Sequence, residues 1–188
     1  MNTIVKMLVV LSCIGIISGG SLSMLSTWAA PKIAANRKAD TERAIFLVQP
    51  EASKYEEVAT VDFELYQVFT EDDEAIGYAM PWEGSGFQGK IRLIFGVRND
   101  LMTLTSIEVL DQLETPGLGT KILEEPFTSQ FRNLKADPQV DWVKGAPASK
   151  ATEIETITGA TISAKAVVFI INDGLQQLRA SVPVGEMK

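Results

Sequence analysis

An uncharged stretch near the amino terminus constrains the chain more than any other feature, because no charged residue occurs between Met7 and Pro31. A helix of this length would extend about 37 Å at about 1.5 Å per residue. That exceeds the roughly 30 Å hydrocarbon core of a bilayer. Glycines and serines interrupt the stretch, and small residues are common where transmembrane helices pack together. We therefore predict a transmembrane anchor over residues 1–31 and a folded domain over residues 32–188.

A cleaved signal peptide is the alternative interpretation of the same stretch. Lys6 is the only basic side chain before it, and the possible cleavage sites place Thr27 or Trp28 where a small residue is needed. These flanks favour a retained anchor. Basic residues follow the stretch, and the positive-inside rule applied to them would keep the domain in the cytoplasm. They are Lys32, Arg37, Lys38 and Arg43.

Composition excludes several chemistries. The chain has no histidine, which rules out Ser-His and Cys-His catalysis and His-ligated haem. Its one cysteine, Cys13, lies in the apolar stretch and cannot by itself hold an iron–sulfur cluster or close an internal disulfide. The net charge is -7, which repels phosphate backbones, so we expect no nucleic-acid partner. Redox chemistry in this chain would need an organic cofactor.

Hydrophobic periodicity predicts an α+β fold. Ile91, Leu93, Phe95 and Val97 alternate with other residues as in a half-buried strand. Further strands are predicted at 63–69, 76–80, 104–110, 142–144 and 154–157, helices at 32–49, 123–134 and 162–178, a loop at 84–86 and a turn at 98–100. The expected architecture is an antiparallel sheet flanked by helices and tethered by one amino-terminal transmembrane helix.

The segment from Glu155 to Ser163 is the first candidate site. A predicted strand ends there, a turn of small residues follows, and a helix begins. Gly159 and Ala160 allow the backbone to approach a ligand closely. Free N–H groups at the helix start favour an anion such as a phosphate, beside the hydroxyl of Thr161. The alternative is an ordinary helix start in which Thr158 or Thr161 is the N-cap.

The segment from Glu114 to Gly119 is the second candidate site. Pro116-Gly117 favours a type II turn, which would expose several N–H groups. Leu118 would cover a flat ring placed against this turn. The alternative is a surface turn after a strand.

Together the two segments resemble a known family. Residues 158–161, with an acid three residues earlier, match the flavinylation motif of the FMN-binding domain family, and residues 114–119 match a second signature of its respiratory subunits. Residues 86–91 resemble the glycine-aromatic segment that usually precedes that signature. The chain is similar over nearly its whole length to G subunits of Rnf complexes. The C subunits of sodium-pumping NADH:quinone reductases are close relatives, and the length of 188 residues favours the G subunits.

The resemblance implies roles for individual residues. Thr161 would carry FMN through a phosphoester, formed by a separate flavin transferase that uses FAD and a divalent metal. Glu155 stands where the family has Asp, which keeps the charge, and Ser163 is a second hydroxyl close by. The remaining implied contacts fall into two groups. Thr158, Gly159 and Ala160 would line the attachment turn, and Glu114, Thr115, Leu118 and Gly119 would contact the isoalloxazine ring.

The resemblance also implies a function. In Rnf complexes electrons pass between ferredoxin and NAD+ while sodium ions or protons cross the membrane. We expect a one-step FMN relay, anchored in the inner membrane with its domain on the outer side, against the simple charge count. Its expected partners are the other Rnf subunits, the flavin transferase and the lipid bilayer. The alternatives are the C subunit of a quinone reductase, another extracytoplasmic flavin carrier, and a cofactor-free membrane-tethered assembly module.

Other residues have competing interpretations. Trp82 and Trp142 could stack on a flavin, but aromatic residues of this kind favour core packing. Among the lysines that could meet a flavin phosphate, Lys144, Lys150 and Lys165, the sequence favours Lys165, which lies one turn into the predicted helix.

Overall fold

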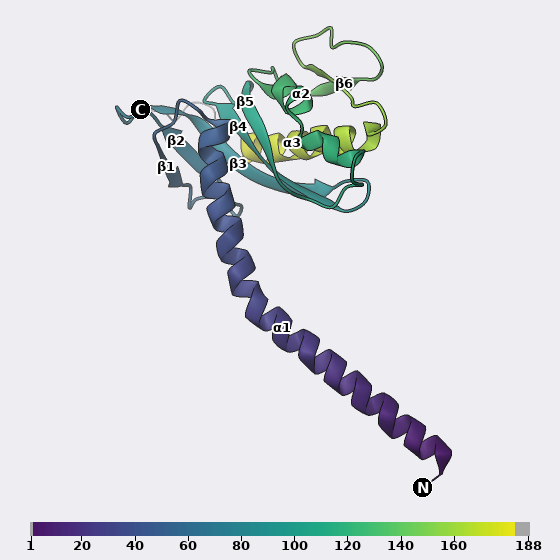
Figure 1. The fold of residues 1–188 in the computed structure, drawn as a ribbon. Helices are drawn as coiled ribbons and strands as arrows, with labels where there is room; N and C mark the ends of the chain where they lie inside the picture. Colours follow the sequence, from purple (N-terminus) through teal and green to yellow (C-terminus); the bar gives the residue numbers. More distant parts are fainter. Residues whose placement is uncertain (1, 183–188) are drawn as a thin grey trace. The chain divides into compact units, whose positions relative to one another are not determined.

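The computed structural model describes residues 2–182 of the chain and begins with helix α1, Thr3–Val48 (Figure 1). The predicted anchor and the helix predicted after it form one continuous helix, which passes through Pro31. The apolar part of α1 reaches a mean hydropathy of 2.1. Within the described residues, α1 is the one helix long and apolar enough to cross a membrane. Contacts divide the chain into two units, Met1–Asp40 and Thr41–Lys188.

Five antiparallel strands form the sheet of the second unit, in the order β1-β2-β3-β4-β5. The strands are β1 (Lys54–Glu57), β2 (Tyr66–Phe69), β3 (Ala75–Ser85), β4 (Lys90–Arg98) and β5 (Leu104–Gln112). Two further strands, β6 (Asp141–Val143) and β7 (Glu153–Glu155), pair in parallel as a separate small sheet. The prediction of an α+β fold with an antiparallel sheet is confirmed.

Both faces of strand β4 are buried. Leu93 and Phe95 face the main core, which includes apolar residues of helix α3, Thr161–Ser181. Ile94 faces the other way and packs with Ala44 and Ile45 from the last turns of α1. Figure 1 shows α3 running along the sheet. Since burial of apolar area drives folding, these two clusters hold the sheet between helices on its two faces.

Hydrogen bonds fasten the carboxyl end of α1 to the sheet. The buried Gln49 amide donates to the carbonyls of Tyr78 and Val97, at 2.9 and 3.1 Å. The Thr105 hydroxyl donates to the Val48 carbonyl at 2.5 Å, which satisfies one of the carbonyls left free at the helix end. A Cβ on Gly96 would lie 2.1 Å from the Thr105 hydroxyl, so the close approach requires glycine.

One predicted strand is longer in the structure, and one strand was not predicted. β3 continues to Ser85, beyond the end predicted at residue 80 and into the loop predicted at 84–86. Pro81 is tolerated because β2 pairs with β3 only as far as Ala79, so β3 has a free edge at the proline. Gly84 leaves room for Ile170 of α3, whose nearest atom would be 2.6 Å from a Cβ. β1 was missed because it is short and mostly charged and lacks apolar alternation.

The helix predicted over residues 123–134 is wrong as a continuous element. Three short pieces occupy the region: η1 (Gly119–Leu123), α2 (Glu125–Thr128) and η2 (Ser129–Phe131). Pro126 lacks an N–H group and begins a new helix instead of continuing the previous one. Phe127 and Phe131, four residues apart, are nevertheless both buried.

Candidate functional site

A tight turn precedes helix α3 and presents Thr161 as its first residue. The Ala160 N–H donates to the Ile157 carbonyl at 3.0 Å, and Gly159 has a φ of +87°. These are features of a type II turn with glycine at the third position. The N-cap is Ala160, and no side chain caps the helix. Neither Thr158 nor Thr161 is therefore the N-cap that the alternative interpretation required.

The second candidate segment forms a similar turn beside the first. The Leu118 N–H donates to the Thr115 carbonyl at 3.2 Å, and Gly117 has a φ of +75°. The predicted type II turn is confirmed. Leu118 Cδ2 lies 3.5 Å from the position that a Cβ on Gly159 would occupy, so the two turns are in contact. Leu118 remains 49% exposed and is free to cover a ligand.

Glu114 joins the segments around this site from a buried position. Its Oε1 accepts hydrogen bonds from the N–H groups of Phe87 and Gln88, at 2.8 and 3.0 Å. Its Oε2 accepts a short hydrogen bond from the hydroxyl of Ser163 in α3. A Cβ on Gly119 would lie 2.7 Å from Glu114 Cβ. The β3–β4 hairpin, the 115–119 turn and the start of α3 therefore meet at one carboxylate.

A cavity of about 450 Å³ lies between the two turns. Its size is typical of small-molecule sites. Eight of the ten predicted site residues line it: Thr115, Leu118, Gly119, Thr158, Gly159, Ala160, Thr161 and Ser163. The other lining residues are Phe87, Lys144, Gly145, Thr156 and Ile162. Among the described residues that line the cavity, Lys144 is the only one with a charged side chain.

Thr156 gives the cavity an unsatisfied polar group. The residue is 4% exposed, and its Oγ1 has no hydrogen-bond partner within residues 2–182. A buried polar group without a partner is costly and is usually satisfied in the functional state. The uncapped N–H groups of α3 lie at the same cavity. This donor set suits an anionic, oxygen-rich group such as a phosphate.

The hydroxyls near the start of α3 differ in their accessibility. Ser163 is 3% exposed and is engaged with Glu114. Thr161 is half-buried, and its hydroxyl makes one long bond of 3.4 Å to the Ile157 carbonyl. Thr158 is exposed but precedes the turn glycine. Thr161 therefore combines access with a position directly at the helix start.

Two predicted site residues lie outside the lining of this cavity. Glu114 faces protein donors, as described above. Glu155, in β7, exchanges backbone hydrogen bonds with the side chain of Gln130 and lines a neighbouring cavity of about 340 Å³. Thr156 and Thr158 line both cavities, so Glu155 lies on the other side of the 157–160 turn.

Of the candidate lysines, Lys144 lines the cavity, whereas the preferred Lys165 does not. Lys165 lies over the ring of Trp142, with Nζ 3.5 Å from the ring centre, as in a cation–π pair. Lys144 lines the cavity instead. Trp142 and Trp82 pack against the core, as expected, and neither lines the cavity. Lys144 was one of the three lysines that the sequence offered for a flavin phosphate, although Lys165 was preferred to it. Thr156 was given no role from the sequence, because the pairing of β6 with β7 places it in the cavity wall.

Comparison with known proteins identifies the family. The FMN-binding domain model matches residues 86–176, a range that includes both turns. The chain is 30% identical over 145 residues to the G subunit of the Na(+)-translocating ferredoxin:NAD(+) oxidoreductase complex of Acetobacterium woodii, covering 69% of each chain. The chain belongs to the family of G subunits of ion-translocating oxidoreductases. It is also 26% identical to the G subunit of the ion-translocating oxidoreductase complex of Methanosarcina acetivorans, over 94% of this chain and 95% of that protein.

Solved structures show the same fold. NqrC from Shewanella oneidensis aligns with a TM-score of 0.56 at 19% identity, over 71% of this chain and 74% of that one. The C subunit of the Na(+)-translocating NADH-quinone reductase from Parabacteroides distasonis aligns with a TM-score of 0.53 at 23% identity, over 67% and 64% of the two chains. The expected relationship to the C subunits is confirmed at the level of the fold.

Proposed function

We propose that the chain relays electrons through FMN bound covalently to Thr161, as the G subunit of an ion-translocating ferredoxin:NAD+ oxidoreductase. The observation that carries this proposal is the position of the Thr161 hydroxyl. It lies at an uncapped helix start, in a cavity that also holds the unsatisfied Thr156 hydroxyl. The family model over residues 86–176 and the name of the Acetobacterium relative support the cofactor and the complex.

The residues of the cavity fit such a group by their chemistry. Free N–H groups at the start of α3 and the ammonium of Lys144 favour the negative charge of a phosphodiester. Thr156 offers a hydroxyl donor from the cavity wall. Leu118, Phe87 and Ile162 are 49–60% exposed and provide apolar surface for a flat ring. When bound, the flavin supplies reversible electron transfer, and these residues hold it and shield it from water.

Attachment requires a partner enzyme, because the chain has no histidine to activate the threonine. We propose a separate transferase that uses FAD and a divalent metal. A bond forms between Thr161 Oγ and the phosphorus of the FMN half, the hydroxyl proton is lost, and AMP leaves as the pyrophosphate bond breaks. Thr161 is thus a substrate in this step.

Membrane anchoring completes the proposal. The predicted anchor over residues 1–31, which α1 includes from Thr3 onward, would span the inner membrane once, and residues 32–188 would carry the flavin on the outer side. The partners of this chain would be the other subunits of the complex and the lipid bilayer. Accessibility of an engineered cysteine in the domain to an impermeant maleimide, in intact cells with Cys13 replaced by serine, tests the side.

The intact mass of the chain purified from its native membrane tests the covalent bond. FMN attached through its phosphate adds about 438 Da and makes the denatured band fluorescent. We expect the added mass on the native chain and on Thr158→Ala, and its loss from Thr161→Ala. Retention of the mass by Thr161→Ala would place the bond elsewhere. An unmodified native chain in cells that contain the transferase would instead favour the cofactor-free assembly module.

A further inference from the structure

Three backbone N–H groups at the start of α3 point to an anion. They belong to Thr161, Ile162 and Ser163, and none of them has an acceptor within residues 2–182, whereas the N–H of Ala164 donates to the Ala160 carbonyl at 3.0 Å. All three residues line the cavity between the two turns, called the flavin cavity below. Free donors at a helix start favour an anion, but every helix has such a start, so this feature alone does not define a binding site.

The Thr156 hydroxyl provides an independent sign of a ligand at the same place. The Thr156 side chain lines the flavin cavity, the residue is 4% exposed, and its Oγ1 has no partner within residues 2–182. The backbone holds the residue in place, because its N–H donates to the Val143 carbonyl at 2.9 Å. A cavity occupant that accepts hydrogen bonds would satisfy this hydroxyl, as most buried polar groups are satisfied.

The 157–160 turn brings these two sets of donors together. The turn is closed by the hydrogen bond from the Ala160 N–H to the Ile157 carbonyl at 3.0 Å. The first and fourth residues of a β-turn lie within about 7 Å of each other. Thr156 and Thr161 flank the turn directly and are therefore neighbours. One ligand with several oxygens would reach both the hydroxyl and the helix start.

Charge selects which cavity such a ligand would enter. Thr156 also lines the neighbouring cavity of about 340 Å³, but the carboxylates of Glu124 and Glu155 line that cavity as well. The flavin cavity has no carboxylate among its described lining residues, and its one charged side chain is the ammonium of Lys144. An anion is therefore favoured on the side of the free N–H groups.

We propose that Thr156 and the start of α3 form a site that binds phosphate monoesters without a covalent bond. The Thr156 hydroxyl donates to one phosphate oxygen, and the N–H groups of residues 161–163 donate to the others. The inference deepens the proposed function and rests on it only for the natural ligand, which is the phosphate of FMN. Binding satisfies a buried hydroxyl, so an occupied site stabilises the domain.

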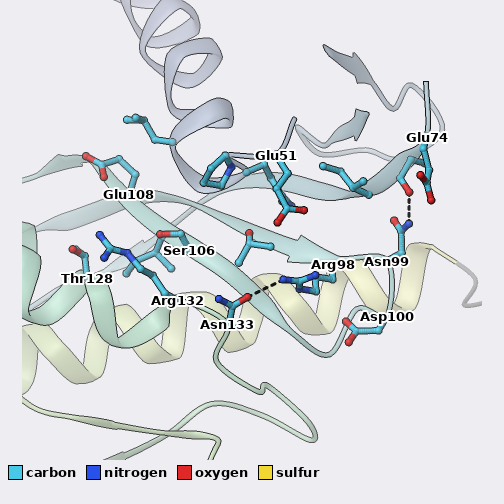
Figure 2. Close-up of a pocket in the computed structure, with 17 residues that line it drawn as sticks. Glu51, Glu74, Arg98, Asn99, Asp100, Ser106, Glu108, Thr128, Arg132 and Asn133 are labelled. Atoms are coloured by element: carbon cyan, nitrogen blue, oxygen red, sulfur yellow. Dashed lines mark hydrogen bonds between the residues drawn. The ribbon is translucent and has the colours of Figure 1, made fainter. Parts of the chain in front are cut away.

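A larger cavity of about 730 Å³ is the competing place for an anion, because Arg98 and Arg132 line it (Figure 2). Arg98 donates to the neutral side chain of Asn133 at 2.9 Å, a bond drawn in Figure 2, and keeps its positive charge. Carboxylates, among them Glu51 and Glu74, line the same cavity and disfavour an anion there. This cavity shares no lining residue with the flavin cavity, so Asn133 reports on it separately.

A titration of the full chain with inorganic phosphate tests the site. The chain is produced in cells that lack the transferase, purified in detergent and followed through the amide resonances of Ile162, Ser163 and Asn133. Potassium chloride at matched ionic strength is the comparison. We expect phosphate to shift Ile162 and Ser163 saturably and to leave Asn133 unchanged. Shifts at Asn133 alone, equal shifts with chloride, or no saturable shift would overturn the proposal.

Thr156→Val removes the hydroxyl and keeps the shape of the side chain. It should weaken phosphate binding at least roughly tenfold, because the lost hydrogen bond is to a charged group. It should not lower the free energy of unfolding without phosphate, because it removes an unsatisfied buried group. Thr156→Ser should retain binding. Undiminished binding by Thr156→Val, or a joint loss of binding and stability, would overturn the proposal.

Thr152→Val is the matched control for this variant. Thr152 is half-buried, lies directly before β7 and lines neither the flavin cavity nor its neighbour. We expect it to bind phosphate as the native chain does. Equal weakening by Thr152→Val and Thr156→Val would show an indirect effect of the β6–β7 region and would count against the proposal.

The flavin mass separates this proposal from the proposed function, because the titration uses chains without flavin. A chain that binds phosphate beside Ile162 but gains no flavin mass from the transferase would support the phosphate site and contradict the proposed function. A chain that gains the mass at Thr161 but shows no phosphate binding dependent on Thr156 would do the reverse.

Discussion

Leu118 Cδ2 lies 3.5 Å from the point where a Cβ on Gly159 would stand, and this contact joins the two turns that line the cavity at the start of α3. Both turns place a glycine at positive φ, +75° for Gly117 and +87° for Gly159. The glycines differ in their surroundings, since a Cβ on Gly117 would have nothing within 4 Å. The two positions therefore form a natural pair for mutation.

Gly159→Ala should lose stability and flavin attachment together. A residue with a Cβ at positive φ costs about 1–2 kcal/mol, and relief of this strain would shift the turn that presents Thr161, where the added methyl would meet Leu118 at an ordinary contact distance. Gly117→Ala is the control, with a similar conformational cost but no contact. We expect both variants to unfold more readily in urea and only Gly159→Ala to show a reduced flavin mass. Equal flavinylation of the two variants would argue against a role for the contact.

Glu114→Ala should be among the most destabilising substitutions in the domain. It leaves the N–H groups of Phe87 and Gln88 and the hydroxyl of Ser163 without their acceptor. Losing a buried, charged acceptor of this kind costs on the order of 3 kcal/mol, which corresponds to a fall in Tm of roughly 10 °C for a domain of this size. Thermal unfolding of the full chain measures it. Glu124→Ala, at an exposed position, serves as the control, and equal melting of the two variants would contradict the prediction.

Lys144→Gln should slow flavin attachment several-fold at low ionic strength. Lys144 is the charged side chain that lines the cavity, and attachment brings a negative phosphate next to it. The effect is modest because Lys144 is exposed and screened, on the order of 1 kcal/mol. The initial rate of mass gain with purified transferase and FAD measures it. Lys144→Arg should retain the rate, and Lys121→Gln, in the neighbouring cavity, should leave it unchanged. A normal rate for Lys144→Gln would remove this residue from the site.

Acid should loosen the loop that carries Lys144. The hydrogen bond from Lys150, followed by bonds from the Ser149 backbone and hydroxyl, lowers the pKa of Glu153 to about 2. A lowered pKa stabilises the folded state above the ordinary value of 4.5, and this stabilisation is lost as the pH falls through about 2. Glu153→Gln should therefore be less stable than the native chain at pH 7 and equal to it near pH 2. Urea unfolding at several pH values, followed by the fluorescence of Trp142, measures the difference. A difference independent of pH would contradict the assignment.

Local sequence patterns predicted much of the fold, because strand alternation and turn residues depend only on neighbouring residues. The alternation of Ile91, Leu93 and Phe95 became β4, and the Pro116-Gly117 pair became the expected turn. The pairing of segments distant in sequence was harder to predict from the sequence. The continuation of β3 through Pro81 depends on where β2 ends, which no local rule contains. The helix predicted at 123–134 failed because Pro126 restarts the backbone, although the apolar spacing around it remained helical.

The candidate site shows the same division. Eight predicted residues line one cavity because two short motifs each encode a complete turn. The role of Thr156 was not predicted, and Lys165 was preferred to Lys144, because Thr156 and Lys144 reach the cavity through the pairing of β6 with β7. Glu114 belonged to the right motif, but its carboxylate faces protein donors, since residues 86–88 fold back onto it.

The Glu114 carboxylate ties together pieces of chain that are far apart in sequence, and this has a consequence for biogenesis. An unfolded chain still contains the residues of the Thr158–Thr161 motif but lacks the surface that presents the last of them. A transferase that reads that surface would modify only chains that have closed around Glu114. The bound flavin would then be present only on chains that have folded, and misfolded copies would carry no flavin.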